Sequence, residues 1–200
     1  MNNPFTSTFI KSADEPHQFP ADSGREIAVA GRSNSGKSTA INAILQRRKL
    51  ARISKTPGRT QLINFFDLGG ERRIVDLPGY GYAKVPESVQ KHWRLLLKSY
   101  FLERTSLAGL IVTIDIRRGP NNLDQIMLDW GASSRVPVAV LLTKSDKLSK
   151  GSSLEQLMNA KKSVPSTVPL ILFSGTKKRG VSEAQALMEK WLIINDEDLA

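Results

Sequence analysis

The stretch EIAVAGRSNSGKSTAINAIL, residues 26–45, decides the fold of this chain. Its first six residues are almost entirely apolar, which is typical of a buried β-strand. Residues 37–45 place apolar side chains at helical spacing, so a helix is expected to leave the strand directly. The turn between them, GRSNSGKS (31–38), matches the pattern G-x-x-x-x-G-K-[ST]. A strand, this turn and a helix in that order predict a loop that wraps phosphate groups.

The residue types in this turn suit that task. Its glycines let successive backbone N–H groups surround phosphate oxygens at a helix N-terminus, where the helix dipole also favours anions. Lys37 is expected to neutralise the β- and γ-phosphates of a nucleotide, and Ser38 to ligate Mg²⁺. The predicted phosphate contacts are Gly31, Arg32, Ser33, Asn34, Ser35, Gly36, Lys37, Ser38 and Thr39.

Apolar runs and helical patterns alternate along the rest of the chain. The continuous apolar runs 107–115, 136–143 and 168–174 predict parallel strands covered on both faces. The runs 61–68 and 72–77 flank a Gly-Gly pair, which indicates a β-hairpin. The prediction is an α/β fold of the P-loop NTPase type, a doubly wound, mostly parallel sheet with one antiparallel hairpin strand and helices on both faces. Helical patterns cover 87–104, 121–132, 152–163 and 182–193, and Ser152 with Glu155 fits a capping box.

Composition limits the chemistry that the chain can perform. It has no cysteine, so disulfides and thiolate metal sites are excluded, and two histidines are too few for a histidine-rich zinc site. No apolar stretch is long enough for a bilayer span and no signal-peptide core is visible, so a cytoplasmic protein is expected. The net charge of +10 favours a polyanionic partner, nucleic acid or less often an anionic membrane surface. A solvated basic surface without such a partner is the alternative.

A second motif, DLPG (76–79), ends an apolar strand. After a phosphate loop, Asp76 is expected to hold Mg²⁺, often through water, and Gly79 to direct a backbone N–H at the γ-phosphate. Between the two motifs, residues 52–61 are polar and basic, which favours a loop that orders around the nucleotide over a plain surface loop. Thr60 is preferred to Thr56 as the second hydroxyl on Mg²⁺, and Gly58 is placed among the nucleotide contacts.

The TKSD motif (143–146) predicts which base is bound. It follows a buried strand and therefore emerges at the carboxyl end of the sheet, where ligands bind. Asp146 can accept two hydrogen bonds from guanine N1–H and N2–H₂, which adenine cannot supply. The alkyl stem of Lys144 can cover one face of the base. GTP and GDP are therefore the expected ligands, and the base contacts are Thr143, Lys144, Asp146, Ser174, Gly175 and Thr176.

These motifs together resemble a known family. The segments TPGRTQLINFF (56–66), VDLPGYGYAKV (75–85), DIRRGP (115–120) and LLTKSDKL (141–148) are similar to the EngB (YihA/YsxC) family of bacterial GTPases, within the translation-factor-related P-loop GTPases. The likeness runs from about residue 26 to residue 191. It implies a Ras-like G domain and a GTPase acting in assembly of the large ribosomal subunit, needed for normal cell division and septation. Thr143, where most GTPases have asparagine, is also what the EngB pattern carries.

Catalysis raises a question at Tyr80, because many guanine-nucleotide switches have a glutamine there to orient the attacking water. One hypothesis is that Asn34 helps to hold K⁺ beside the β/γ bridge, so that Lys37, Thr60, Gly79 and Asn34 form the catalytic set. The other is that Asn34 simply fits a tight loop. Slow intrinsic hydrolysis, raised by K⁺ or by docking on the ribosome, is expected.

Two tyrosines beside the γ-phosphate motif, Tyr80 and Tyr82, also have two interpretations. They either pack the motif against its own domain or form a nucleotide-gated contact surface, since tyrosine supplies rigid, amphipathic contact area.

Basic residues gather around 47–59, 72–73, 117–118, 161–162 and 177–179. They predict salt-dependent contact with ribosomal RNA through its backbone. The alternative function is a GTP-dependent signalling switch that recruits a cell-division protein without RNA contact. A metabolic P-loop kinase is disfavoured by the TKSD motif. The expected organisation is a monomer with an N-terminal segment (1–25), a single GTP-binding domain (26–195) and a C-terminal tail (196–200).

Overall fold

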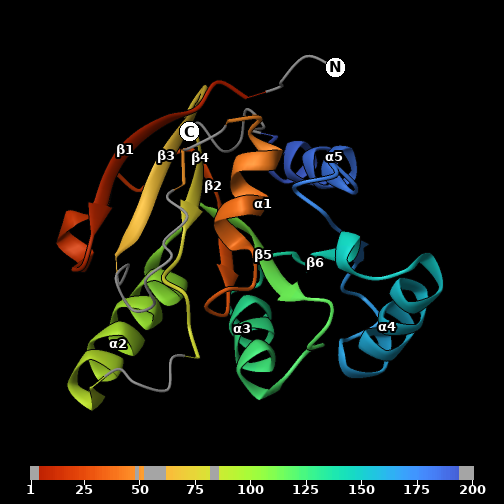
Figure 1. Cartoon of the computed structure of the whole chain (residues 1–200). Helices are drawn as coiled ribbons and strands as arrows, with labels where there is room; N and C mark the ends of the chain where they lie inside the picture. The colour runs from red at the N-terminus through yellow and green to blue at the C-terminus, as the bar shows by residue number, and fades with distance from the viewer. Residues whose placement is uncertain (1–4, 48–49, 52–61, 82–85, 194–200) are drawn as a thin grey trace.

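The computed structural model describes residues 5–47, 50–51, 62–81 and 86–193. Seven strands form one sheet in the order β1-β3-β4-β2-β5-β6-β7 (Figure 1). β2, β4, β5, β6 and β7 are parallel, whereas β3 runs antiparallel to β4 and β1 antiparallel to β3. The strands are β1 Thr8–Ala13, β2 Arg25–Gly31, β3 Ile63–Gly69, β4 Arg72–Asp76, β5 Leu107–Asp115, β6 Val138–Thr143 and β7 Leu170–Leu172.

Five α-helices lie within the described residues, and none of them is long and apolar enough to span a membrane. Two short 3-10 turns accompany them, Pro16–Gln18 before β2 and Ser145–Lys147 after β6. The fold confirms the predicted mostly parallel sheet with an antiparallel hairpin strand. The helices are α1 Lys37–Ile44, α2 Glu87–Glu103, α3 Asn122–Ser133, α4 Lys150–Ser163 and α5 Val181–Trp191.

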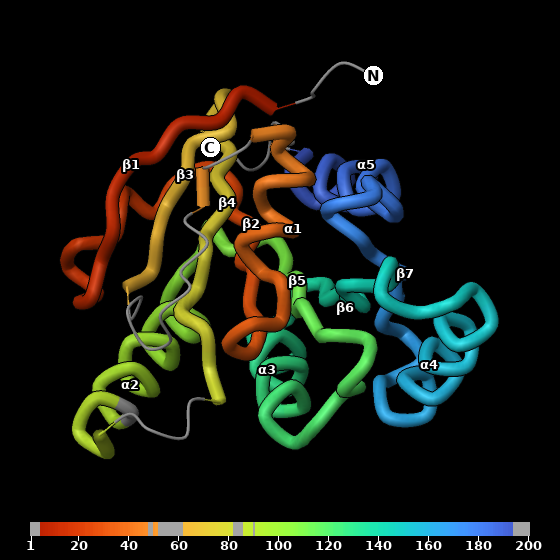
Figure 2. The backbone as a smooth tube through the Cα atoms, in the orientation of Figure 1, coloured from red at the N-terminus to blue at the C-terminus, as the bar shows by residue number. Residues whose placement is uncertain are grey.

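The helices cover both faces of the sheet, as expected. Figure 2 shows α1 beside α5, and these two helices bury Ile41, Ile44 and Met188 against one face. On the other face, α2 and α3 bury side chains such as Tyr100 and Met127, and α4 adds to the same layer. Every residue of β5 is buried, because this central strand is covered on both sides. The continuous apolar pattern of β5 therefore has a direct structural cause.

Two local features differ from the sequence-based expectations. β1 was not predicted, because its residues are mostly exposed and show no apolar face; pairing with β3 makes it a strand. The capping box predicted for Ser152 and Glu155 is wrong. α4 begins earlier, at Lys150, and the Ser149 side chain accepts a hydrogen bond from the backbone N–H of Ser152 at 3.1 Å.

A buried ionic cluster closes the sheet at the start of β2. Glu26 is fully buried and accepts hydrogen bonds from Arg73 and Arg104, each at 2.6 Å. Tyr100 donates to the same carboxylate at 3.2 Å. Arg104 also donates to the backbone carbonyl of Pro20 at 2.8 Å. The segment before β2 is therefore fastened to the edge of the sheet opposite the phosphate loop, and a buried carboxylate is tolerated because it is paired and hydrogen-bonded.

Candidate functional site: a nucleotide-binding edge

Most of the predicted site residues that the structure describes lie at the carboxyl edge of the parallel strands. β2 ends at Gly31, β4 at Asp76 and β6 at Thr143. The phosphate loop connects β2 to α1, and Gly36 precedes the helix with φ +96°, a conformation that favours glycine. Gly36 has no side chain with which to cap α1, and the N–H groups of a first helical turn suit an anion. Gly58, Thr60 and Tyr82 lie outside the described residues.

Two threonines from neighbouring strands hold the phosphate loop in place. Ser35 is buried, and its hydroxyl lies 2.7 Å from the hydroxyl of Thr113 on β5. Thr143 donates a hydrogen bond to the backbone carbonyl of Ser35. A Cβ on Gly31 would lie 2.0 Å from the Thr113 hydroxyl oxygen, so only glycine fits there. The loop is thus tied to β5 and β6, and threonine at 143 supplies a tether; Thr113 was not found from the sequence.

Lys37 and Asp76, predicted from two separate motifs, are in direct contact. Nζ of Lys37 is paired with Oδ1 of Asp76, and both side chains are largely buried. Ser38 follows Lys37 in the first turn of α1. A carboxylate and a hydroxyl are hard oxygen ligands, which suit Mg²⁺ when it also retains water and phosphate oxygens. Ser38 and Asp76 therefore fit a magnesium ion bound together with a nucleotide.

Asp115, at the end of β5, organises the base side of the edge. Its carboxylate pairs with Arg117 at 2.7 Å and lies 3.0 Å from Nζ of Lys144. Burial favours its neutral form, but these hydrogen bonds outweigh that effect and hold the pKa of Asp115 below its usual range. Lys144 also donates to the backbone carbonyl of Asn34 at 2.6 Å. The Lys144 head group is thus fixed between the phosphate loop and Asp115. Asp115 also ends a buried strand, but its contact with Lys144 was not predicted from the sequence.

The structure brings Asp146 together with the loop after β7. Ser174 donates to Oδ1 of Asp146 at 2.6 Å, and this hydrogen bond is the main reason why the pKa of Asp146 is lowered. The Thr176 hydroxyl lies 3.1 Å from that of Ser174. A Cβ on Gly175 would lie 2.8 Å from Cγ2 of Thr39, so this loop packs closely on the first turn of α1. Asp146 is therefore held as an ionised acceptor beside the phosphate loop.

The backbone after the γ-phosphate motif is joined to the phosphate loop. Tyr80 donates its N–H to the Gly31 carbonyl at 3.3 Å and accepts from the N–H of Ser33 at 2.9 Å. Tyr80 is 4% exposed, so the packing interpretation is confirmed for this tyrosine. The ring points into the domain, where its hydroxyl donates to Asp124 at 2.7 Å. Tyr80 consequently does not take the place of a water-orienting glutamine.

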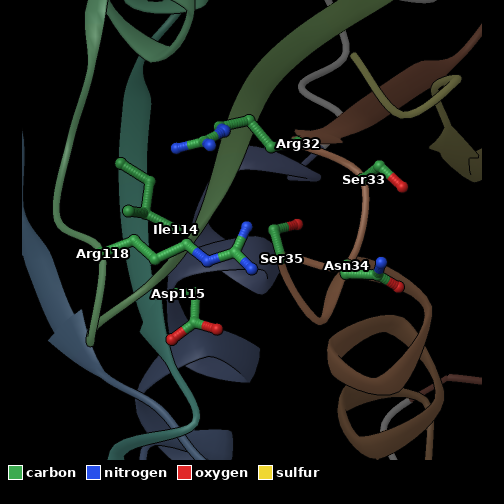
Figure 3. Close-up of a pocket in the computed structure, with 7 residues that line it drawn as sticks. All are labelled: Arg32, Ser33, Asn34, Ser35, Ile114, Asp115 and Arg118. Atoms are coloured by element: carbon green, nitrogen blue, oxygen red, sulfur yellow. The ribbon is translucent and has the colours of Figure 1, made fainter. Parts of the chain in front are cut away.

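A small pocket beside the phosphate loop has a basic rim. Figure 3 shows Arg32 and Arg118 on two sides of it, with Asn34 opposite. Asn34 has φ +60°, a left-handed conformation that asparagine adopts more readily than most residues. This backbone agrees with the tight-loop interpretation of Asn34, while its exposed side chain remains available to a ligand. The pocket is lined by Arg32, Ser33, Asn34, Ser35, Ile114, Asp115 and Arg118.

Comparison with known proteins adds to this geometry. The profile of a family described as "50S ribosome-binding GTPase" matches residues 26–144. A probable GTP-binding protein EngB from Methylobacillus flagellatus is 46% identical over 196 residues, which cover 96% of this chain and 95% of the relative. A second, from Hydrogenovibrio crunogenus, is 46% identical over 189 residues, 93% of this chain and 89% of that protein.

Solved structures support the same fold. A crystal structure of a probable GTP-binding protein engB matches with a TM-score of 0.64 at 22% identity, covering 84% of this chain and 98% of the other. Era from Aquifex aeolicus matches with a TM-score of 0.68 at 23% identity, covering 86% of this chain and 57% of Era.

The fold and the family profile define a P-loop GTPase, a protein that binds GTP and GDP and hydrolyses GTP to GDP and phosphate. At 46% identity over nearly its full length to two such relatives, the chain belongs to the EngB family of GTP-binding proteins.

Proposed function

We propose that this GTPase is a slow switch that acts in assembly of the large ribosomal subunit, and that normal cell division and septation depend on it. The observation that carries this proposal is basic charge beside the nucleotide site. Arg117, Arg118, Lys177 and Lys178 are exposed in loops that follow β5 and β7 at the carboxyl edge. Such a surface suits RNA phosphates. The family description and the net charge of +10 support it.

The first proposed role of the site is to bind the triphosphate. N–H groups of the phosphate loop and of α1 surround the phosphates, Lys37 neutralises the β- and γ-phosphates, and Gly79 directs its N–H at the γ-phosphate. Ser38, Thr60 and Asp76 would hold magnesium, which supplies positive charge to the β- and γ-oxygens when bound. The remaining contacts of the loop are Gly31, Arg32, Ser33, Asn34, Ser35, Gly36 and Thr39.

The second proposed role is to select guanine. Asp146 accepts from N1–H and N2–H₂ of the base, and Ser174 keeps the carboxylate in place at 2.6 Å. The stem of Lys144 covers the base, with its head group anchored on the phosphate loop. Gly58 is proposed as a further nucleotide contact, and Thr143, Gly175 and Thr176 are proposed to complete the base pocket.

Hydrolysis requires water to attack the γ-phosphorus in line with the bond to the β–γ bridging oxygen, which breaks as GDP leaves. Since Tyr80 is turned away into the domain, stabilisation of the developing charge must come from another group. We propose K⁺ near Asn34, or docking on the ribosome, as that source. Equal turnover in Na⁺ and K⁺ that Asn34→Ala leaves unchanged would exclude the cation.

The proposed setting is a cytoplasmic monomer whose GTP-binding domain covers residues 26–195, preceded by an N-terminal segment (1–25) and followed by a tail (196–200). One experiment tests the ribosomal proposal directly, by measuring GTPase activity with and without large-subunit precursors, in potassium and in sodium. Stimulation by the precursors is expected, together with nucleotide-dependent co-sedimentation that is lost at high salt.

The basic edge also leaves one alternative in a different class, a GTP-dependent signalling switch that recruits a cell-division protein without touching RNA. The exposed basic residues at this edge do not by themselves determine the class of partner, because they would also suit an acidic protein surface. Salt-resistant binding to a single protein, with no response to ribosomal particles, would favour this alternative.

A further inference from the structure

Tyr80 and Asp124 form a buried hydrogen bond that the proposed GTP contacts do not use. The Tyr80 hydroxyl donates to Oδ1 of Asp124 at 2.7 Å, and Asp124 is fully buried near the start of α3. The Tyr80 ring also packs near Trp93 of α2, with ring centroids 6.4 Å apart. The side chain that follows the γ-phosphate motif is therefore anchored between two helices, away from the nucleotide edge.

The backbone of the same residue is fixed to the phosphate loop. Tyr80 exchanges hydrogen bonds with Gly31 and Ser33, at 3.3 and 2.9 Å. Gly79 lies immediately before it, and a Cβ on Gly79 would lie 3.5 Å from Ser33. The Tyr80 N–H belongs to the nearly planar Gly79–Tyr80 peptide unit, whereas the Gly79 N–H belongs to the unit before it. Only the φ and ψ rotations of Gly79 separate the two units, so holding Tyr80 limits the directions in which the Gly79 N–H can point.

Asp124 is a costly residue to bury at this place. Its other oxygen accepts from the N–H of Asn121 at 3.0 Å, which completes the capping box of α3. It forms no ion pair with any described residue, although Arg32 acts on it electrostatically from a greater distance. Burial raises the pKa of Asp124. A helix cap alone could be supplied by an exposed residue at far lower cost.

We propose that Asp124 is a positioning residue for GTP hydrolysis, which orients the Gly79 N–H by holding the Tyr80 side chain. Asp124 does not touch the nucleotide; it acts through Tyr80. The inference rests on the proposed role of Gly79 at the γ-phosphate. It also ties the start of α3 to the γ-phosphate motif, so that a shift of the motif must stretch or break the Tyr80–Asp124 hydrogen bond.

The test is a double-mutant cycle with Tyr80→Phe and Asp124→Asn, with kcat measured in single- and multiple-turnover experiments. Tyr80→Phe removes the donor and keeps the ring. Asp124→Asn keeps the shape but leaves one accepting oxygen for two donors. We expect each single variant to lower kcat up to about tenfold, because a typical hydrogen bond contributes up to about that factor, with GDP affinity within about twofold of the starting protein. The double variant should be no slower than either single one.

Asn121→Ala is the matched control for a merely structural role. It removes the side chain that accepts from the N–H groups of Leu123 and Asp124, so it weakens the α3 cap and leaves the Tyr80–Asp124 contact in place. We expect it to lower Tm by an amount similar to Asp124→Asn, with kcat within about twofold. An equal loss of kcat in Asn121→Ala would show that α3 stability, and not the tyrosine contact, limits the reaction.

Two further outcomes would overturn the inference in folded protein. One is unchanged kcat in both single variants, and the other is a double variant whose loss equals the product of the two single losses. Failure of the proposed site itself has a separate signature. Asp76→Asn that retains magnesium-dependent turnover would contradict the assigned metal role, whatever the Tyr80–Asp124 cycle gives.

Discussion

Asp146, the proposed guanine contact, illustrates how a single carboxylate could select the base. Its pKa is lowered chiefly by the Ser174 hydroxyl, so it is ionised and presents only acceptors at neutral pH. Guanine offers two donors on its Watson–Crick edge and adenine does not. In the proposed role, specificity depends on leaving the Asp146 acceptor unpaired when the wrong base is bound.

Asp146→Asn exchanges one acceptor oxygen for an NH₂ donor. We expect GTP affinity to fall at least about a hundredfold, because the amide opposes the N2–H₂ of guanine, while xanthosine triphosphate, with oxygen at that position, binds better than to the starting protein. Competition titrations with both nucleotides measure this. Ser174→Ala should have a smaller effect: we expect GTP affinity to fall about tenfold and the affinity for xanthosine triphosphate not to rise. If Asp146→Asn left the preference for GTP over xanthosine triphosphate unchanged, Asp146 would not be a base contact.

A second prediction for a single residue concerns Thr143. Its hydroxyl donates to the Ser35 carbonyl and lies 3.1 Å from the carbonyl oxygen of Ile114, so Thr143→Val leaves a buried carbonyl without its donor at a cost of about 1–3 kcal/mol. We expect GDP and GTP affinity to fall about tenfold in parallel, as measured by calorimetry, since the phosphate loop is no longer held. Thr143→Ser, which retains the hydroxyl, should bind within about threefold of the starting protein; equal affinity in the valine variant would contradict the tether.

At the scale of the elements, the segment before β2 shows how side-chain hydrogen bonds attach a loop to the sheet. Asp22 accepts hydrogen bonds from the N–H groups of Thr105 and Ser106, each at 2.9 Å, and so joins this segment to the turn that leads into β5. Burial works toward a higher pKa, but the hydrogen bonds outweigh it and hold the pKa of Asp22 well below its usual range.

The sign of the resulting pH dependence follows from that direction. A carboxyl group whose pKa is lower in the folded chain stabilises it above about pH 4, and the contribution is lost as the pH falls through the folded pKa. We expect Asp22→Asn to lower the free energy of unfolding at pH 7, and the difference from the starting protein to shrink steadily below about pH 4. Urea unfolding between pH 3 and pH 7 measures both; a difference independent of pH would contradict the linkage.

The sequence predicted the elements best where burial dictates composition. β5 has apolar residues throughout because it is covered on both faces, and the turn at residues 31–38 needs glycine where a Cβ would strike Thr113. β1 was missed because an exposed edge strand depends on its partner and not on its own pattern. The start of α4 was misplaced because several serines near it can each serve as a cap, and only the fold selects Ser149.

In the site, motif residues were predictable but their supports were not. Asp76, Asp146 and Lys37 follow from spacing within known patterns. Thr113 and Asp124 come from other strands and helices, and their roles appear only when those elements are brought to the same edge. Their residue types carry no local signal, because a buried threonine or a helix-capping aspartate is ordinary in any α/β domain.

On the scale of the whole molecule, the parallel sheet separates two edges of different character. The carboxyl edge carries the proposed nucleotide site and the exposed arginines of the loop after β5, whereas the amino edge is closed by the Glu26 cluster. A helix that returns between parallel strands ends at the amino edge, so the exposed Lys161 near the end of α4 lies away from the nucleotide. Basic residues of the two edges can therefore be compared directly.

Arg118→Ala and Lys161→Ala each remove one exposed positive charge, but from opposite edges. If RNA phosphates meet the nucleotide edge, Arg118→Ala should weaken binding to large-subunit particles about two- to fivefold at moderate salt and reduce the slope of log K against log salt by about 0.7–0.9, since one phosphate contact is lost. Lys161→Ala should leave both quantities unchanged. Sedimentation over a salt series, with the GTP and GDP forms in parallel, measures them. Equal losses in both variants would mean that binding follows net charge alone, and a normal slope in Arg118→Ala would move the RNA contact away from this edge.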